Sequence, residues 1–345
     1  MGRSRELSEL ASAYDGSSLG FRNRIINGDM RIDQRNSGAS VTPSVLYSTY
    51  TLDRWITSYS VASKFSVQQS TTAPAGFVNS ALITSLSAYT VGSGENYNFG
   101  QIIEGLNMAD FGWGTASAQA VTLSFWVRSS LTGTFGGAVQ NSASNRSYPF
   151  SYTISSANTW EQKTITISGD TTGTWLTTNG VGARIYFGLG AGSTASGTAG
   201  AWAAANYFSA TGATSVVGTS GATFYITGVQ LEAGSVATPF ERRPYGLELQ
   251  LCQRYYTCTV PGSGIRITTY ADAVVSDGQV YCPFKVSMRA DPTVVVTGSG
   301  TTLTNTGGLT TYLINRDGFS FNVSSTSGAG MRGYTSCTFT ATAEL

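Results

Sequence analysis

The sequence predicts an all-β protein built from antiparallel sheets, and two observations support this fold class. Hydrophobic and polar residues alternate with a period of two in several segments. Val121, Leu123, Phe125 and Val127, for example, share one face of Ala120–Arg128, which predicts a strand with one buried side. Aromatic residues make up 12% of the chain and charged residues only 11%, which suits sheets with an uncharged, hydroxyl-rich surface.

Many short strands separated by Gly, Ser, Asn and Thr turns predict an antiparallel jelly-roll or β-sandwich body. Arg184–Leu189 shows the same alternation as the segment above. In Thr223–Glu232 the hydrophobic parity changes at Gly228, and this change predicts a β-bulge at that glycine.

Two stretches of the body, Gly133–Ser147 and Gly190–Ala222, consist largely of Gly, Ser, Thr and Ala. We expect both to be long loops without regular structure. Loops of this length are commonly functional or disordered, so surface contact through them is one interpretation and simple flexibility is the other.

The last part of the chain predicts a smaller β domain. Gln279–Arg289 alternates like a strand, and Pro283 would remove one donor from its ladder, so we expect an edge strand. Asp317-Gly318 precedes a hydrophobic run and is typical of a hairpin turn. A domain of about eighty residues has a thin core and gains most from oligomerisation.

Two short helices are expected outside the sheets. Leu7, Leu10 and Tyr14 lie on one stripe of a helix over residues 3–14, which is marginal alone and must dock on the body, on sister copies or on a larger assembly. We therefore expect these three side chains to serve anchoring to a larger assembly or oligomerisation. A second helix, Gly246–Tyr256, follows Pro244 and has a broad apolar surface suited to a buried joint.

These elements define four segments. Residues 1–20 form an N-terminal anchoring segment, and residues 21–243 form the jelly-roll body. Residues 244–257 form the linking helix, and residues 258–345 form the C-terminal β tip domain.

The composition excludes several classes of function. Lys and Arg number 20 against 19 Asp and Glu, so the chain has no electrostatic basis for general nucleic-acid or anionic-membrane binding. The chain has no histidine, which excludes Ser-His-Asp and Cys-His nucleophiles and zinc sites that depend on histidine. No apolar run approaches the length of a membrane span, and no secretory signal opens the sequence. We expect no cofactor and no metal.

Four cysteines, Cys252, Cys258, Cys282 and Cys337, lie in the last hundred residues without a C-x-x-C spacing, which disfavours a metal cluster. A disulfide remains an alternative, but a chain made without export favours reduced, buried thiols.

Aromatic side chains are the remaining signal for a binding site. Trp126 and Tyr186 fall opposite the predicted core face of their strands, and Trp202 and Tyr207 lie in the second glycine-rich stretch. Flat amphipathic rings bind at low entropic cost, so we assign these four residues to glycan binding. The alternative for each is burial between subunits or under loops.

Three segments resemble a known family. Residues 24–30 (RIINGDM), with Gln34-Arg35 and Asp53-Arg54-Trp55, resemble the opening motif of phage tail-fibre and receptor-binding proteins. Residues 224–234 (FYITGVQLEAG) are similar to the closing strand of that family, and residues 238–256 resemble the segment after it. The resemblance spans residues 21–256.

The resemblance implies a body like the jelly roll of carbohydrate-binding modules and a trimeric virion appendage. Such modules often hold calcium, but Arg31 and Thr227-Gly228 stand where its acidic ligands would fall, so no calcium is expected. We therefore expect a bacteriophage tail fibre in the virion: a non-catalytic homotrimer whose N-terminus docks on tail or capsid proteins and which attaches to host surface polysaccharide. A trimer would present three weak binding sites together, and their effective concentration would strengthen the attachment.

Two alternatives remain open. The first is a passive virion component, such as a collar, adaptor or head fibre, without receptor binding. The second is a glycan depolymerase that uses two carboxylates, for which the candidates are Asp29, Asp33, Asp53, Glu95, Glu104 and Asp110.

Overall fold

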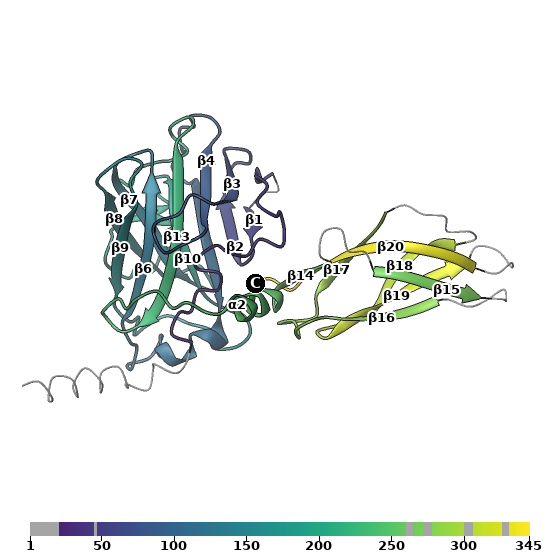
Figure 1. The fold of residues 1–345 in the computed structure, drawn as a ribbon. Coiled ribbons are helices and arrows are strands. Elements are labelled where there is room, and N and C mark those ends of the chain that lie inside the picture. Colours follow the sequence, from purple (N-terminus) through teal and green to yellow (C-terminus); the bar gives the residue numbers. More distant parts are fainter. Residues whose placement is uncertain (1–20, 45–46, 260–264, 272–277, 300–305, 326–330) are drawn as a thin grey trace, which may run out of the picture. The chain divides into compact units, whose positions relative to one another are not determined.

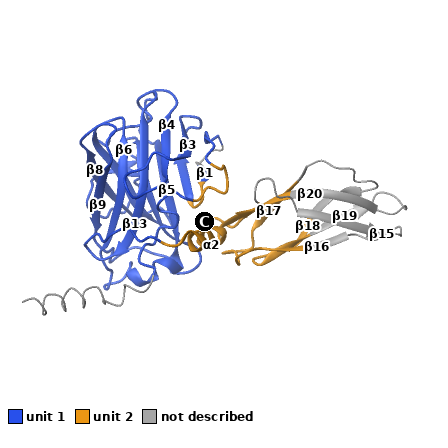
Figure 2. Ribbon diagram, viewed as in Figure 1, with its two compact units in different colours: residues 1–31, 38–51, 55–242 blue, residues 32–37, 52–54, 243–345 orange. Residues whose placement is uncertain are grey.

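A computed structural model describes residues 21–44, 47–259, 265–271, 278–299, 306–325 and 331–345 (Figure 1). The chain forms two compact units (Figure 2). Unit 1 comprises the described residues up to 31 together with 38–51 and 55–242, and unit 2 comprises 32–37, 52–54 and 243–345. Unit 2 thus contains the linking helix, the tip and two short segments from the front of the chain. The expected helix over 3–14, with Leu7, Leu10 and Tyr14, lies outside the described residues.

Unit 1 is an antiparallel β-sandwich of the jelly-roll type, and the predicted all-β fold is confirmed (Figure 1). Sheet A has the strand order β3-β4-β13-β6-β9, and sheet B has the order β1-β2-β5-β10-β7-β8. The strands of sheet A are β3 (Phe65–Ser70), β4 (Ser80–Ser85), β6 (Val121–Ser129), β9 (Glu161–Ile167) and β13 (Thr223–Ala233). Those of sheet B are β1 (Tyr47–Leu52), β2 (Trp55–Tyr59), β5 (Asn96–Glu104), β7 (Gly133–Asn141), β8 (Ser147–Ile154) and β10 (Val181–Ala191).

Smaller elements lie between these strands. They are the short parallel pair β11 (Ser196–Gly197) and β12 (Ser209–Ala210), and two 3-10 turns, η1 (Gly105–Asn107) and η2 (Ala109–Phe111).

The core between the two sheets follows the alternation read from the sequence. Phe125 and Val127 on β6 are fully buried, as is Phe187 on β10. The Phe125 and Phe187 rings meet edge to face with centroids 4.9 Å apart. Because large apolar rings from both sheets interdigitate, burial of this surface is the main force that holds the sandwich together.

The predicted bulge in β13 is confirmed, and it changes the partner of that strand. Before the bulge, Thr223–Ile226 pairs with β4. The register with β6 then shifts between Thr227 and Gln230, and Gly228 has a left-handed φ of 60°. After the bulge, the Val229 N–H donates to the Gly28 carbonyl at 2.9 Å. The segment after residue 21 therefore continues sheet A where β4 stops.

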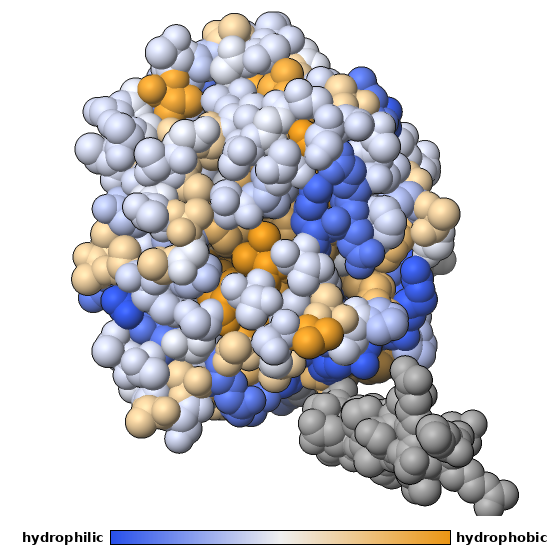
Figure 3. Space-filling model, turned by 90° about the vertical axis from the view of Figure 1, so that its left-hand side faces the viewer, coloured by the Kyte–Doolittle hydropathy of each residue, from blue (hydrophilic) through white to orange (hydrophobic). Residues whose placement is uncertain are grey.

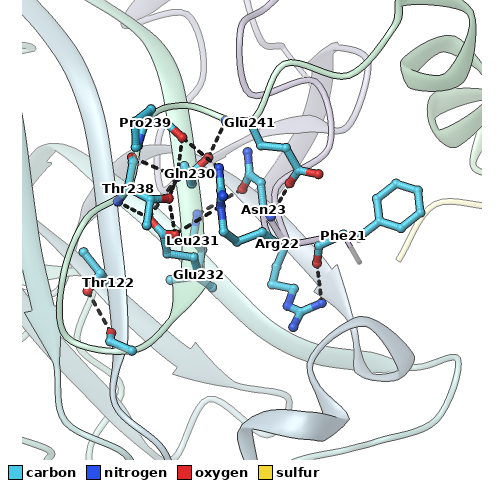
Figure 4. A network of polar contacts seen from close by, with 12 residues as sticks. Phe21, Arg22, Asn23, Thr122, Gln230, Leu231, Glu232, Thr238, Pro239 and Glu241 are labelled. Carbon is cyan, nitrogen blue, oxygen red and sulfur yellow. Dashed lines mark hydrogen bonds and ion pairs between the residues drawn. The ribbon is translucent and has the colours of Figure 1, made fainter. Parts of the chain in front are cut away.

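Polar side chains hold this segment against β13 (Figure 4). Asn23 accepts the Leu231 N–H with Oδ1 at 3.0 Å and donates from Nδ2 to the Val229 carbonyl at 3.0 Å. Glu241 accepts the Asn23 N–H at 2.6 Å. Two of the segments with family resemblance, at the start and the end of the body, are thus neighbours joined by hydrogen bonds.

The expectation of a loop over Gly133–Ser147 is wrong, because residues 133–141 form strand β7 between β8 and β10. Glycine is required on the outer face of this strand. A Cβ on Gly136 would lie 2.5 Å from Ser209 Oγ and 2.8 Å from the Ala210 nitrogen. The missing side chain admits the segment after β10, so glycine here reflects close packing and not disorder.

Unit 2 contains one described helix and two small sheets. The helix α2 (Tyr245–Gln253) confirms the predicted short helix, but it ends before Tyr256, where β14 begins. One sheet joins β14 (Tyr256–Cys258), β15 (Ile265–Ala271), β17 (Thr293–Ser299) and β20 (Met331–Thr342). The other has the order β16-β19-β18, from β16 (Gly278–Pro283), β18 (Thr306–Asn315) and β19 (Gly318–Ser325).

The tip has the thin core that its length predicts. Phe284, Phe319 and Phe339 contact one another, with the Phe319 and Phe339 centroids 5.0 Å apart. Strand β16 lies at the edge of its described sheet as predicted. It ends at Pro283, however, so the expected strand over Gln279–Arg289 does not continue past the proline. The predicted hairpin is confirmed where Asn315 pairs with Gly318.

A buried cluster of charged and aromatic residues in unit 2 joins segments that are far apart in sequence. Glu344 forms ion pairs with Arg35, at 2.6 Å, and with Arg54. The Arg54 guanidinium lies 3.5 Å from the centre of the Tyr255 ring, and that of Arg35 lies 3.8 Å from the Tyr256 ring. Since Arg54 is 1% exposed, its charge requires this carboxylate and this ring.

Asp53 lies in the same cluster and is fully buried. It accepts the Gln34 N–H and the Gln34 Nε2–H, each at 2.6 Å. Burial raises the pKa of Asp53 to about 6, although Arg35 and the two hydrogen bonds from Gln34 oppose the shift. The native state therefore binds a proton more tightly at Asp53 than the unfolded chain does.

Replacement of Gly28 tests the junction between the N-terminal segment and β13. A Cβ at this position would lie 2.2 Å from the Val229 carbonyl oxygen. We expect Gly28→Ala to lower the free energy of unfolding of unit 1 by about 2–4 kcal/mol through overpacking and a broken hydrogen bond. Urea denaturation followed by tryptophan fluorescence measures it, because all six tryptophans lie in unit 1. Gly94→Ala is the control, since its Cβ would meet only Thr194 Oγ1 at 3.7 Å; equal stability of the two variants would contradict the expectation.

The raised pKa of Asp53 predicts a pH-dependent stability of unit 2. Between about pH 4, where the carboxyl of the unfolded chain titrates, and about pH 6, the native state holds a proton that the unfolded state has released. The free energy of unfolding should therefore fall as pH rises through this window, by about 1–3 kcal/mol from this group. Asp53→Asn should lack that component, as measured by calorimetry and by hydrogen exchange of peptides over residues 245–258. The exposed Asp291→Asn is the control, and a profile for Asp53→Asn that matches the unmodified protein would refute the assignment.

Candidate functional site

A strip of half-exposed aromatic rings lies on the outer face of sheet A. Trp126 on β6 and Tyr225 on β13 point away from the core, because their neighbours Phe125 and Phe224 are fully buried. Trp160, just before β9, meets the Tyr225 ring at right angles with centroids 6.0 Å apart. The three rings thus come from β6, from its neighbour β13 and from the residue that precedes its other neighbour, β9.

The bulge at Gly228 extends this strip toward the β3–β4 connection. A Cβ on Gly228 would lie 2.6 Å from the Phe77 ring and 3.1 Å from Trp126 Cδ1, so both rings pack against the bare glycine backbone. Phe77 in turn meets Phe240 with centroids 5.2 Å apart. We call Trp160, Tyr225, Trp126, Phe77 and Phe240 the aromatic strip.

Polar side chains border the aromatic strip. Gln162 pairs with Trp126 across the β6–β9 ladder and is exposed, as are Thr164 and Thr166 on the same strand. Arg128 Cζ lies 5.0 Å from the centre of the Tyr225 ring. Amphipathic rings beside hydroxyl, amide and guanidinium groups are suited to polyhydroxylated ligands, which present both apolar faces and hydrogen-bonding edges.

The structure separates Tyr186 and Tyr207 from Trp126, because both belong to the side of sheet B. Tyr186 faces outward on β10, but the segment after β10 covers it, and its ring packs against Phe208 with centroids 5.7 Å apart. Only 6% of Tyr186 is exposed. The Tyr207 carbonyl accepts the Gln140 Nε2–H at 2.7 Å, which holds this part of the segment on sheet B. Residues 190–222 are therefore a packed cover for the outer face of sheet B.

Trp202 lies in a separate aromatic cluster on unit 1. Its ring meets those of Trp113 and Trp175, each with centroids 5.3 Å apart, and that of Tyr148 at 5.2 Å. Its indole N–H donates to the Ser168 carbonyl at 2.8 Å. Trp113, Trp175 and Tyr148 are buried and Trp202 is partly buried, so the cluster forms a small secondary core.

Asp170 fixes this cluster through a dense set of hydrogen bonds. It accepts two bonds from Arg146, at 2.9 and 2.7 Å, and one from the Trp175 indole N–H at 3.0 Å. Burial alone would raise the pKa of Asp170, but these hydrogen bonds outweigh it and lower the pKa. The Asp170 carboxylate therefore holds Arg146 and Trp175 in place, and we assign it a structural role.

The described residues contain no group of three or more His, Cys, Asp or Glu side chains that could hold a metal ion. The positions that the family resemblance assigns to calcium ligands have other partners here. Arg31 forms an ion pair with Asp29, and the Thr227 hydroxyl donates to the Asn79 carbonyl at 2.7 Å. Cys252 and Cys258 are free thiols, and the Cys337 side chain lies outside the described residues.

The candidate carboxylates of the depolymerase alternative are scattered among structural contacts. Asp53 bonds to Gln34, as described above, and Asp110 pairs with Arg24 at 2.5 Å. Glu95 accepts the Tyr89 hydroxyl at 3.0 Å and the Gly92 N–H at 2.9 Å.

Sequence reasoning identified Trp126 but missed Tyr225, Trp160, Phe77 and Phe240 as parts of one surface. The sequence pattern could have predicted Tyr225, because the alternation that buries Phe224 and Ile226 places Tyr225 on the outer face. It could not have predicted Phe77 and Phe240, because these residues lie in connections whose paths depend on the folded chain.

Uncharged residues dominate the surface of unit 1. Figure 3 shows the side that carries β8 and β9 in Figure 1, where most residues have intermediate hydropathy and few are strongly hydrophilic. A hollow on this side is lined with hydrophobic residues. Among the described residues, no helix is long and apolar enough to cross a membrane.

Comparison with known proteins finds similar folds among solved structures, namely a phage tailspike domain and several carbohydrate-binding modules. The enzymatically active domain of tailspike protein 4 from bacteriophage CBA120 matches 61% of this chain, at 13% identity and a TM-score of 0.32. The match covers 21% of the tailspike chain, so this chain spans about a fifth of its length.

Two carbohydrate-binding modules match over nearly their whole length. The family 11 module from Clostridium thermocellum, solved with a β-1,3-1,4-mixed-linked tetrasaccharide, matches 56% of this chain and 100% of its own, at 12% identity and a TM-score of 0.29. A xylan-binding domain from Paenibacillus barcinonensis matches 59% of this chain and 99% of its own, at 9% identity and a TM-score of 0.26. Likeness at this level says nothing about what this chain binds.

No protein-family model matches the chain, and no curated protein matches it.

The structural role of Asp170 can be tested by its removal. We expect Asp170→Ala to lower the free energy of unfolding of unit 1 by about 2–4 kcal/mol, because Arg146 and the Trp175 indole lose a buried acceptor. Asp110→Ala is the matched control, since Asp110 is 55% exposed in its pair with Arg24 and should cost less than about 1 kcal/mol. Urea denaturation of both variants measures the difference, and a small, equal effect would show that Asp170 does not hold the cluster.

Proposed function

We propose that this protein is a bacteriophage virion appendage of the tail-fibre type that attaches to host surface polysaccharide through the outer face of sheet A. The observation that carries the proposal is the aromatic strip, a row of partly exposed rings on the outer face of sheet A. Rings placed in this way stack on the apolar faces of sugars while threonine and glutamine side chains beside them hydrogen-bond to hydroxyl groups.

The rest of the molecule fits this role. With only 11% charged residues, the chain has a surface rich in hydroxyl groups. The opening and closing segments of the body resemble those of phage tail fibres, and they pair with each other at the Gly228 bulge. A homotrimer docked on the virion by its N-terminal segment would present three strips, and effective concentration would strengthen the attachment. The proposal assigns no catalysis to the protein.

Substitution in the aromatic strip tests the binding role. We expect Trp126→Ala and Trp160→Ala each to weaken binding of the protein to its host polysaccharide by about tenfold, because each removes a stacking platform at the centre of the contact. An array of bacterial lipopolysaccharides and capsules would identify the ligand, and calorimetric titration with the captured polysaccharide would give the affinities.

Tyr245→Ala is the matched control, since Tyr245 is an exposed aromatic residue on unit 2 and its loss should leave binding unchanged. Circular dichroism would verify that the variants are folded. Binding to no polysaccharide, together with failure to compete with phage adsorption, would reject receptor binding and leave a passive collar, adaptor or head fibre. Release of reducing ends from a bound polysaccharide would reject the non-catalytic assignment, and a monomeric mass by light scattering would reject the trimer.

A further inference from the structure

Two arginines on the aromatic strip have no carboxylate partner. Of the described cations in unit 1, Arg22, Arg24, Arg31, Arg146 and Lys163 each form an ion pair. Lys64, Arg128, Arg184 and Arg242 form none. Lys64 lies over the Tyr89 ring and Arg184 donates to the Asn141 and Ser142 carbonyls, whereas Arg128 and Arg242 lie at the aromatic strip. In a chain with so few charges, unpaired guanidinium groups at a candidate binding surface are candidates for contact with an anionic ligand.

The two guanidinium groups lie at different places along the strip. Arg128 donates from Nε to the Asn158 carbonyl at 2.9 Å and lies over Tyr225, so its two terminal nitrogens remain available. Arg242 is exposed, and its Cζ lies 4.6 Å from the centre of the Phe77 ring and 5.7 Å from that of Phe240. Stacking on rings holds both groups in place and leaves their N–H edges free for a ligand.

The acidic side chains closest in sequence to the strip are already engaged. Glu161 accepts the N–H groups of Ser155 and Ser156 and pairs with Lys163 at 2.6 Å. Glu241, next to Arg242 in sequence, accepts the Asn23 N–H. Neither carboxylate forms an ion pair with Arg128 or Arg242.

We propose that the aromatic strip binds an acidic polysaccharide, with sugar rings stacked on Trp126, Tyr225 and Phe77 and carboxylate groups bound by Arg128 and Arg242. This inference rests on the proposed glycan-binding function and adds the chemical class of the ligand. A planar guanidinium donates two parallel hydrogen bonds to a carboxylate. A polymer of uronic or sialic acids offers both features of the site, since each unit has a ring face and a charge.

The test compares polymers that differ in charge or in ring content. Polygalacturonate and polysialate are titrated into the full-length protein at low salt, beside the fully methyl-esterified form of each. A poly(glycerol phosphate) serves as a polymer with charge but without sugar rings. We expect at least one of the two acidic polymers to bind about tenfold or more tightly than its ester and than the phosphate polymer, and to lose affinity as salt rises.

Variants assign the charge effect to residues. Arg128→Gln and Arg242→Gln should each weaken binding of the acidic polymer about three- to tenfold, while Arg128→Lys keeps part of the affinity because the charge remains. Arg316→Gln is the matched control, since Arg316 is an exposed arginine of unit 2 and its loss should change nothing. Circular dichroism checks that each variant is folded.

Equal affinity for an acidic polymer and its ester, or identical behaviour of Arg128→Gln and Arg316→Gln, would overturn this inference and leave the proposed glycan binding intact. Binding of none of these polymers would also overturn it, while the array of bacterial polysaccharides decides the proposed function separately. A Trp126→Ala variant that changes the oligomeric mass without any change in polymer binding would assign the strip to contact between copies of the chain, and this result too would overturn the inference.

Discussion

The bulge at Gly228 is the constraint on which the rest of unit 1 depends. Before it, β13 pairs with β4 and buries Phe224 and Ile226, and after it the opposite parity faces the core. The extra residue lets the segment after residue 21 take the place of β4, with Gly28 against Val229. The same glycine leaves room on the outer face for Trp126 and Phe77 to meet. One irregularity thus closes the sandwich on one side of the sheet and builds the aromatic strip on the other.

Charge is used sparingly, and several of the buried charges form pairs that hold distant segments together. Glu344 joins Arg35 and Arg54, and Asp170 joins Arg146 to an indole. Because a buried unpaired charge is costly, such pairs must form together or not at all, which favours a single arrangement of the segments. Against this background, the free guanidinium groups over the strip stand out as available for a ligand.

Glycine has two structural roles in this chain, close packing between segments and irregular backbone geometry, and sequence patterns predict only the second. The composition of Gly133–Ser147 predicts a loop, but the segment contains β7, where Gly136 admits Ser209 of the segment after β10. At Gly228 the change in parity of the flanking residues marked the irregularity correctly. The difference is that parity is encoded locally, whereas close approach depends on which distant segment packs against the strand.

The sequence by itself determined the all-β class, the buried faces of β6, β10 and β13, the bulge, the edge strand at Pro283 and the helix α2. Each follows from local periodicity or from one residue's backbone chemistry. Only the tertiary structure decided which rings share a surface. It buried Tyr186 under residues 190–222, placed Trp202 in a second cluster, and assembled the strip from β6, β13 and three connections. The physical reason is that alternation fixes the side of a strand on which a residue lies, while the cover on that side comes from segments far away in the chain.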